Sequence, residues 1–308
     1  MTHITSFISR VSEDCLRETL FALSCDPLPY RKVNFTRPGQ RLTTLDEADA
    51  YIEGRLTGFG YAAWREECAV RAFGLDTSKP IRHQYASPPP DAPVHKAYNL
   101  YAERPGSVHR DEIILLLAHK DSQSWVNSPG AYDNASGTSA VIEIARVLAD
   151  YPARRTLRFL CCNEEHTPWT SVTAANRARE RGDNLIAIIN VDSVGGKSDE
   201  DIAAGRKTNS TLYTCPAGKP FADLMAEVND RYQIGLTQQS YERASPGDDD
   251  GSFIKAGYEC AVANIGSYPY ADAEYHLPGD IPERVDIPNV RMAAQATLAA
   301  VITLDART

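Results

Sequence analysis

Three largely apolar, strand-like runs separated by helical patterns constrain the fold of this chain more than any other feature. The runs are Glu112–Ala118, Thr156–Cys162 and Leu185–Val191. Continuous runs of this length are typical of strands that are covered on both faces, as in parallel sheets. Further elements are expected around them, namely strands at Tyr98–Ala102, Thr211–Thr214 and Glu259–Ile265 and helices at Asn134–Leu148, Thr170–Arg181, Phe221–Arg231 and Pro288–Leu304. The sequence therefore predicts an α/β fold with three α/β/α layers around a mixed, mostly parallel sheet.

Two more helices are expected before this α/β part. The first is predicted over Ser6–Ser24 because its apolar residues share one helical face. The second is predicted to begin at Thr44, where Thr44 and Glu47 have the spacing of a capping box, and to end before Gly58. The proline-rich residues 87–90 are interpreted as a surface loop, because too little chain precedes them for an independent core. We expect a single domain over residues 1–308, with the helices of 1–60 packed on an α/β core of 96–308.

Composition and charge exclude several classes of protein. Hydrophobic residues make up 43% and charged residues 24%, which is ordinary globular usage. The net charge of −9 argues against a nucleic-acid partner, since such binding relies on basic residues. No apolar run reaches the roughly 18 residues of a membrane span, and the first residues lack a secretory pattern, so a cytoplasmic protein without a membrane partner is expected. Seven scattered cysteines without a Cys-x-x-Cys pair argue against a disulfide framework or a zinc knuckle.

Histidine and acidic residues follow the predicted strands where each strand ends. They are His119 and Asp121 after the first run, Glu164 and Glu165 after the second, Asp192 after the third, Asp133 at the start of a helix, and His276 in the loop after Glu259–Ile265. The carboxyl ends of parallel strands meet at one crevice, so we expect these side chains to gather there. Each residue taken singly is more often a surface or structural group. Only their joint placement indicates a site.

Histidine and carboxylate ligands without cysteine suit zinc, manganese or cobalt. Five candidate ligands are too many for one catalytic zinc, which keeps about three protein ligands, but they suit two ions that share a carboxylate and a water. Metal binding lowers the pKa of water to about 7, so a nucleophilic hydroxide exists at neutral pH. Of the adjacent Glu164 and Glu165, one would bind metal and the other would carry the proton from water to the leaving amine.

Four segments together resemble the co-catalytic zinc aminopeptidases, the family of bacterial leucyl aminopeptidase, aminopeptidase Y and carboxypeptidase Q. They are LLLAHKDSQSWVNSPGAYDNASGTSAVIEIARVL, RFLCCNEEH, AIINVDSVGG and EYHLPGD. The resemblance implies a zinc-dependent exopeptidase fold of the phosphorylase/hydrolase-like type. It also implies an aminopeptidase that binds a peptide with a free N-terminus and hydrolyses its first peptide bond with a hydroxide bridged by two Zn²⁺ ions.

The same resemblance implies a role for each site residue. His119 and Asp192 would hold one metal, Glu165 and His276 the other, and Asp133 would bridge both. Glu164 would be the general base and acid. Asp121 would orient His119, as expected of a carboxylate behind a metal-binding imidazole.

Substrate contacts are expected from residues near these motifs. Tyr268 or Tyr270 would polarise the scissile carbonyl or stabilise its oxyanion, with ordinary packing as the alternative. The family's Ser-Asp-His-x-x-Phe segment is here 248–253, where Asp250 replaces the histidine and Phe253 is retained. Its acidic triplet is either a solvated turn or a group that favours the α-ammonium or a basic side chain of a substrate. His166 stands where the family has glycine, and is interpreted as an exposed histidine or one that reaches substrate.

Two alternatives stay open. A glutaminyl cyclase shares this fold but works with one zinc, so a metal count near one and cyclisation of N-terminal glutamine would favour it. A peptidase fold that has lost catalysis and acts as a binding module would stay inert on aminoacyl-nitroanilides and dipeptides after metal is supplied. The complete ligand set favours the peptidase.

Overall fold

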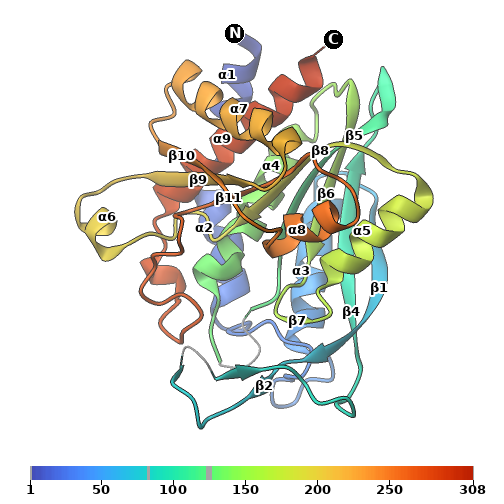
Figure 1. Ribbon diagram of the computed structural model, residues 1–308, viewed down its shortest axis with the longest axis vertical. Helices are drawn as coiled ribbons and strands as arrows, with labels where there is room; N and C mark the ends of the chain where they lie inside the picture. The colour runs from blue at the N-terminus through green and yellow to red at the C-terminus, as the bar shows by residue number, and fades with distance from the viewer. Residues whose placement is uncertain (1, 82–83, 123–126, 308) are drawn as a thin grey trace.

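A central mixed sheet organises the computed structural model, which describes residues 2–81, 84–122 and 127–307. Across these residues the strand order is β10-β9-β11-β8-β5-β6-β4-β1-β7 (Figure 1). The strands are β1 (Ala63–Ala72), β4 (His95–Arg104), β5 (His109–His119), β6 (Arg155–Cys162), β7 (His166–Thr167), β8 (Asn184–Asp192), β9 (Thr208–Tyr213), β10 (Thr237–Glu242) and β11 (Ala261–Ile265). The short strands β2 (Gly74–Leu75) and β3 (Tyr85–Ala86) pair separately.

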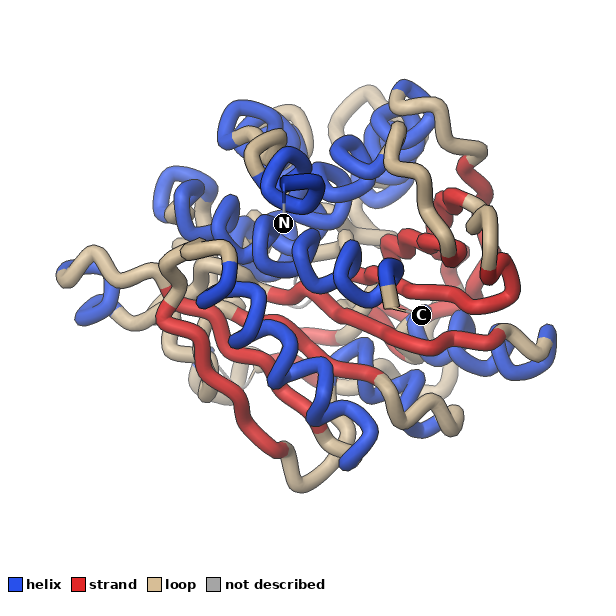
Figure 2. Tube along the Cα trace, turned by 90° about the horizontal axis from the view of Figure 1, so that it is seen from above, coloured by secondary structure: helices blue, strands red, loops and turns tan. Residues whose placement is uncertain are grey.

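Helices cover both faces of the sheet (Figure 2). They are α1 (Thr2–Ile8), α2 (Glu13–Ser24), α3 (Thr44–Gly58), α4 (Gly137–Leu148), α5 (Thr170–Arg181), α6 (Asp199–Ala203), α7 (Lys219–Arg231), α8 (Asp248–Lys255) and α9 (Ile287–Ala306), with a π-helical turn η2 (Ala131–Ser136) and the 3₁₀ turns η3 (Pro216–Gly218) and η4 (Pro282–Arg284). Apolar residues of α1–α4, α7 and α9 share one core cluster with Ile114 and Leu116 of β5. Those of α5 and α8 share a second cluster with Leu115 and Leu117. The predicted three-layer α/β fold is confirmed.

Four neighbouring strands form the parallel centre of the sheet. β5 runs parallel to both β6 and β8, and β8 runs parallel to β11. The outer strands β4 and β9 run antiparallel to β6 and β11. In this register His119 lies beside Cys162, and Asp192 lies beside Ile265. The ends of the four strands, and therefore the residues that follow them, lie at one edge.

Two helix predictions were wrong in detail. The segment predicted as one helix over Ser6–Ser24 is two helices, because the Ser12 side chain caps α2 by accepting from the Cys15 backbone N–H at 3.3 Å. The Ser12 backbone N–H bonds Glu143 of α4 at 2.7 Å and is unavailable to a continuous helix. The capping box of α3 is formed by Thr43 and Asp46, one residue earlier than predicted.

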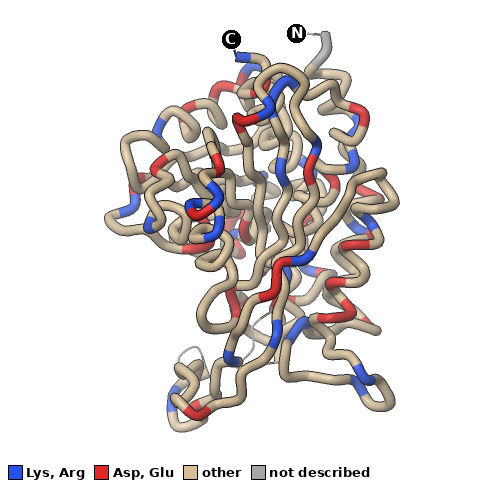
Figure 3. Tube along the Cα trace, turned by 90° about the vertical axis from the view of Figure 1, so that its right-hand side faces the viewer, with Lys and Arg blue, Asp and Glu red and all other residues tan. Residues whose placement is uncertain are grey.

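Charged positions are spread over the fold. In the view of Figure 3, basic and acidic residues are interspersed along the chain and do not gather by sign on one side. No helix in the described ranges has both the length and the apolar character needed to cross a membrane.

Candidate metal centre

Six side chains form two neighbouring groups at the carboxyl edge of the parallel strands. One group is His119, Glu164 and Asp192, and the other is Asp133, Glu165 and His276. Within each group the potential ligand atoms all lie within 4.8 Å of one another. β5 ends on His119, β8 ends on Asp192, and the glutamates directly follow β6. The topology thus brings together all five predicted ligands and Glu164.

Asp133 belongs to the second group and also contacts His119 of the first. Its Oδ1 is 2.9 Å from Nε2 of His119, and its Oδ2 is 2.5 Å from Nε2 of His276. Asp280 fixes this position, because its carboxylate accepts the backbone N–H groups of Tyr132 at 2.7 Å and Asp133 at 3.1 Å. One carboxylate therefore faces an imidazole from each group, as a bridging ligand would.

A close approach of backbones makes room for this turn. Gly137 begins α4 so near β8 that a Cβ there would lie 2.1 Å from the carbonyl oxygen of Val191. Nδ2 of Asn134 donates a hydrogen bond to the same carbonyl oxygen at 3.0 Å. The Asp-Asn-x-Ser-Gly motif thus combines a ligand, an amide that holds β8, and the glycine that permits the contact.

Asp121 is a buried carboxylate that forms hydrogen bonds with several residues of the site. Its carboxylate contacts Nδ1 of His119 at 3.2 Å and Nδ1 of His166 at 2.7 Å. It also accepts the backbone N–H groups of Glu164 at 3.0 Å and Glu165 at 2.8 Å. One side chain therefore orients an imidazole and both glutamates.

Both interpretations of His166 were wrong. The residue is 0% exposed, so it is neither a surface histidine nor a group open to substrate. Nδ1 faces Asp121, and Nε2 accepts the Val33 backbone N–H at 3.4 Å. This pattern is that of a neutral imidazole that donates through one nitrogen and accepts through the other. The sequence did not reveal this hydrogen bond, because Val33 lies 133 positions away from His166.

Burial raises the pKa of the two adjacent glutamates at this edge. Desolvation and then Asp249 raise the pKa of Glu164 well above its usual value. Desolvation raises the pKa of Glu165 to about 8, with His276 opposing the shift and Asp133 adding to it. For His276 burial acts to lower the pKa, but Asp133 and Glu165 outweigh it and raise it to about 9. Such a concentration of buried acids needs positive charge close by.

The residues expected to contact substrate fall into two sets. Tyr270 donates its hydroxyl to Oδ2 of Asp192 at 2.9 Å. Its ring stacks on Tyr275, which stacks in turn on His276. Tyr268 is 39% exposed and lines a cavity of about 310 Å³ together with Tyr270 and Asp248. Both predicted tyrosines thus line this cavity, and Tyr270 connects it to Asp192 of the first group.

Asp250 and Phe253 lie elsewhere. The acidic triplet is the first turn of α8 and not a solvated turn, since Asp249 and Asp250 are 0% exposed. Asp250 pairs with the guanidinium of Arg243, and Phe253 lies in the core cluster beneath α5 and α8. Neither residue is among those that line the cavity beside Tyr270.

The sequence of the chain also matches a known protein family. Residues 99–301, more than half of the chain, match the model of peptidase family M28. The chain belongs to peptidase family M28. The family resemblance expected from the motifs is thereby confirmed, and the range that matches M28 contains all six residues of the two candidate groups.

Relatives with curated names agree with this membership. Aminopeptidase YwaD of Bacillus subtilis (strain 168) is 25% identical over 205 residues, which is 65% of this chain and 42% of YwaD. A probable zinc metalloprotease of Pyrenophora teres f. teres (strain 0-1) is 29% identical over 154 residues, covering 47% of this chain and 31% of the relative. The matched part of the chain thus spans less than half the length of either relative.

Solved structures share the fold over nearly the whole chain. The aminopeptidase from Aneurinibacillus sp. strain AM-1 has a TM-score of 0.72 at 16% identity and covers 97% of this chain and 95% of its own. The glutaminyl cyclase of Bacteroides thetaiotaomicron, bound to N-acetylhistamine, has a TM-score of 0.69 at 16% identity, with 95% and 98% covered. The M28 fold of this chain is thus shared by two kinds of enzyme.

Sequence reasoning missed Asp280 and Tyr275 in this M28 site. Asp280 holds the turn that carries Asp133, and Tyr275 stacks on His276 at a ring distance of 3.9 Å. Both lie in the segment EYHLPGD that was used for its histidine alone. A signal was therefore present, since buried polar residues next to a ligand often orient it.

Proposed function

We propose that this chain is a metal-dependent aminopeptidase that hydrolyses the N-terminal bond of peptides. The observation that carries the proposal is the Asp133 carboxylate, which faces one imidazole from each of two ligand groups beside Glu164. Membership of a peptidase family supports it, as does the similarity to aminopeptidase YwaD. We further propose that residues 1–308 act as one metallopeptidase domain.

The residues present fit two divalent ions, with Zn²⁺ as the proposed metal. The donors are imidazole nitrogens and carboxylate oxygens, which zinc accepts. His119 and Asp192 would hold one ion, Glu165 and His276 the other, and Asp133 both. Oε2 of Glu164 is buried without a hydrogen-bond partner among the described residues, as expected of an acid whose partner is a water or a substrate. Bound ions would supply Lewis acidity that makes water nucleophilic near neutral pH.

Residues of the chain would handle the proton and the substrate. Glu164 would take a proton from water and deliver it to the leaving amine, a task that its raised pKa suits. Asp121 would keep Nε2 of His119 directed at the site by holding Nδ1. The cavity beside Tyr268 and Tyr270 would receive the side chain of the N-terminal residue, and Tyr270 would place its hydroxyl near the scissile carbonyl.

Peptide hydrolysis with defined termini tests this proposal. Purified protein in Zn²⁺, Co²⁺ or Mn²⁺ is given a pentapeptide with a free amino terminus, and in parallel the same peptide N-acetylated or C-amidated. We expect stepwise loss of N-terminal residues from the free and the C-amidated peptides, read by mass spectrometry, and none from the acetylated one. Release of C-terminal residues would instead indicate a carboxypeptidase. Cyclisation of an N-terminal glutamine without hydrolysis would support the glutaminyl cyclase whose fold it shares.

Glu164→Gln is the matched variant for this assay. The amide keeps the size of the side chain but cannot accept the proton, so kcat should fall by about 100-fold or more. Bound metal, measured by inductively coupled plasma mass spectrometry, should stay at the wild-type level because Glu164 is not one of the proposed ligands. Full turnover by this variant would contradict the role given to Glu164.

A further inference from the structure

Arg31 is a fully buried cation in the connection between α2 and α3. Its side chain is 0% exposed, and its guanidinium donates only to backbone carbonyls in the described part of the chain. Nε donates to Lys120 at 2.6 Å, one terminal nitrogen to Pro129 at 2.7 Å and to Leu23, and the other to Gly130 at 2.8 Å. The guanidinium therefore donates hydrogen bonds to three carbonyls of one segment and to one carbonyl of α2.

The three carbonyls lie at the two ends of the segment that joins His119 to Asp133. Lys120 directly follows the ligand His119, and Gly130 directly precedes the turn η2 that carries Asp133. The backbone adds a second link to the first end, because the Arg31 N–H donates to Oγ of Ser122 at 3.0 Å and the Ser122 N–H donates to the Arg31 carbonyl at 3.1 Å. Arg31 thus forms hydrogen bonds with both ends of the segment.

Local geometry at Gly130 shows how close this contact is. A Cβ at Gly130 would lie 3.0 Å from a terminal nitrogen of Arg31, and the backbone there has a φ of +58°. Glycine therefore permits both the left-handed turn and the approach of the guanidinium. Burial lowers the pKa of Arg31 to about 10, against the opposing effect of Asp121, Asp280 and Asp133, so the side chain is charged at neutral pH.

We propose that Arg31 is a positioning residue of the metal centre, which sets the placement of His119 relative to Asp133 by holding both ends of the segment between them. This inference rests on the proposed function, since it assumes that these two residues bind divalent ions. Arg31 lies outside residues 99–301, so the M28 match does not include it. The segment before the family core would then be part of the active unit.

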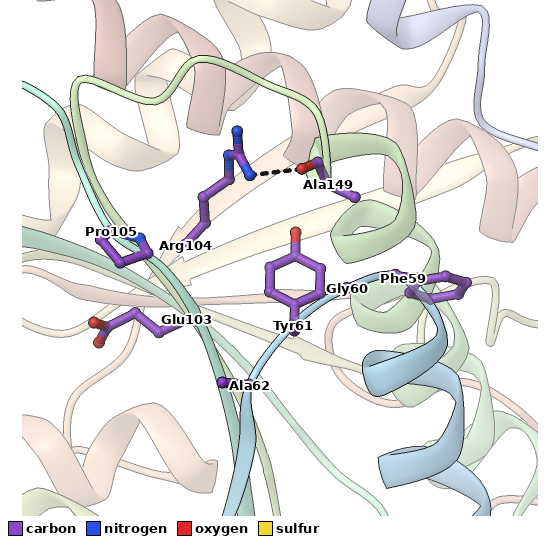
Figure 4. A pocket seen from close by; sticks show the side chains of 8 residues that line it. All are labelled: Phe59, Gly60, Tyr61, Ala62, Glu103, Arg104, Pro105 and Ala149. Atoms are coloured by element: carbon purple, nitrogen blue, oxygen red, sulfur yellow. Dashed lines mark hydrogen bonds between the residues drawn. The ribbon is translucent and has the colours of Figure 1, made fainter.

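Arg31→Lys tests the proposal, because lysine keeps the charge but not the planar fork that reaches carbonyls on both sides. Arg104→Lys is the matched control. Arg104 also donates to two backbone carbonyls, that of Tyr151 at 2.5 Å and that of Ala149 at 2.6 Å. Figure 4 shows the second of these bonds. It ends β4 opposite Leu157, near the start of β6, whereas the proposed ligand Glu165 lies past the other end of β6.

Metal affinity and ligand geometry are the readouts. Dissociation constants for Zn²⁺ are measured by competition with a chromogenic chelator, and the Co²⁺-loaded proteins are compared by visible absorption. We expect Arg31→Lys to weaken binding of at least one ion by about 10-fold or more and to alter the Co²⁺ spectrum, as changes behind metal ligands do. Arg104→Lys should stay within twofold of wild type with an unchanged spectrum, even where both variants lower the Tm.

Two results separate this inference from the proposed function. A wild type that holds two ions, with Arg31→Lys matching its affinity and spectrum, would overturn the positioning role alone. A wild type that binds no divalent ion would overturn both. Where Arg31→Lys fails to fold, Ser122→Ala removes a single bond of the same anchor and should weaken metal binding on the order of threefold. Unchanged affinity in that variant would also overturn the proposal.

Discussion

Asp133 differs from the other proposed acidic ligands because its two oxygens face Nε2 of two different proposed metal-binding histidines, His119 and His276. Replacing it by alanine should therefore deplete metal at both positions, whereas His276→Ala should deplete only one. Metal content after dialysis, measured by plasma mass spectrometry, checks the pair of variants. Equal losses in the two variants would contradict the bridging role of Asp133.

His166 supports the same site from behind. In His166→Phe the Asp121 carboxylate loses a bond of 2.7 Å and the Val33 N–H loses its acceptor. Leaving buried polar groups unpaired costs about 1–3 kcal/mol, so the free energy of unfolding should fall by that amount in urea titrations. His109→Phe, at the far end of β5, is the control and should change it by less than about 0.5 kcal/mol. A His166 variant as stable as wild type would contradict the contact.

Prediction at the residue scale located side chains that follow a buried strand and missed contacts between residues distant in sequence. His119, Glu164, Glu165 and Asp192 could be named because strand ends converge in an open α/β sheet. Arg31 was not named and the role of His166 was misread, because the partners of both residues lie across the tertiary fold. Asp250 was placed toward substrate because nothing in the sequence shows that Arg243 covers it.

At the scale of elements, α3 places a buried acid against β5. Asp49 of α3 pairs with Lys120 at 3.2 Å, and burial raises the pKa of Asp49 to about 6. Lys120 and Arg65 oppose this shift, and Asp46 adds to it. The folded state therefore holds a proton that the unfolded state has released between about pH 4 and pH 6. By linkage, stability falls as the pH rises through this window.

Asp49→Asn should remove this pH dependence. Relative to the variant, wild type should lose up to about 3 kcal/mol of unfolding free energy between pH 4 and pH 7, since one pKa unit corresponds to about 1.36 kcal/mol. Urea titrations of both proteins at each pH give the difference directly. A constant difference across this range would contradict a raised pKa of Asp49 in the folded state.

Elements with a strong pattern could be predicted, and weakly patterned ones could not. The strands β5, β6 and β8 are buried on both faces, so their apolar runs identify them. In contrast, β10 is largely exposed, and its run TQQSYE carries no burial signal. The break between α1 and α2 was missed because Ser12 fits a helical pattern as well as a cap. The same limit applies to α8, whose acidic start is typical of a turn.

The whole molecule has one main hydrophobic core that joins the N-terminal helices to the α/β part. Phe7, Leu16 and Ile52 share this core with Val141 and Val301. The overall layering could be predicted from the alternation of strands and helices. The positions of Arg31 and Val33 near the proposed metal ligands could not be predicted, because a loop between helices has no periodic pattern that indicates its neighbours. The site therefore depends on two parts of the chain, one that matches the family and one that precedes it.

A crystal grown with excess Zn²⁺, with anomalous diffraction recorded on both sides of the zinc edge, tests the central claim most directly. The account predicts two anomalous peaks, one contacting His119 and Asp192 and one contacting Glu165 and His276, with Asp133 between them. A single peak, or none within reach of these five side chains, would contradict it.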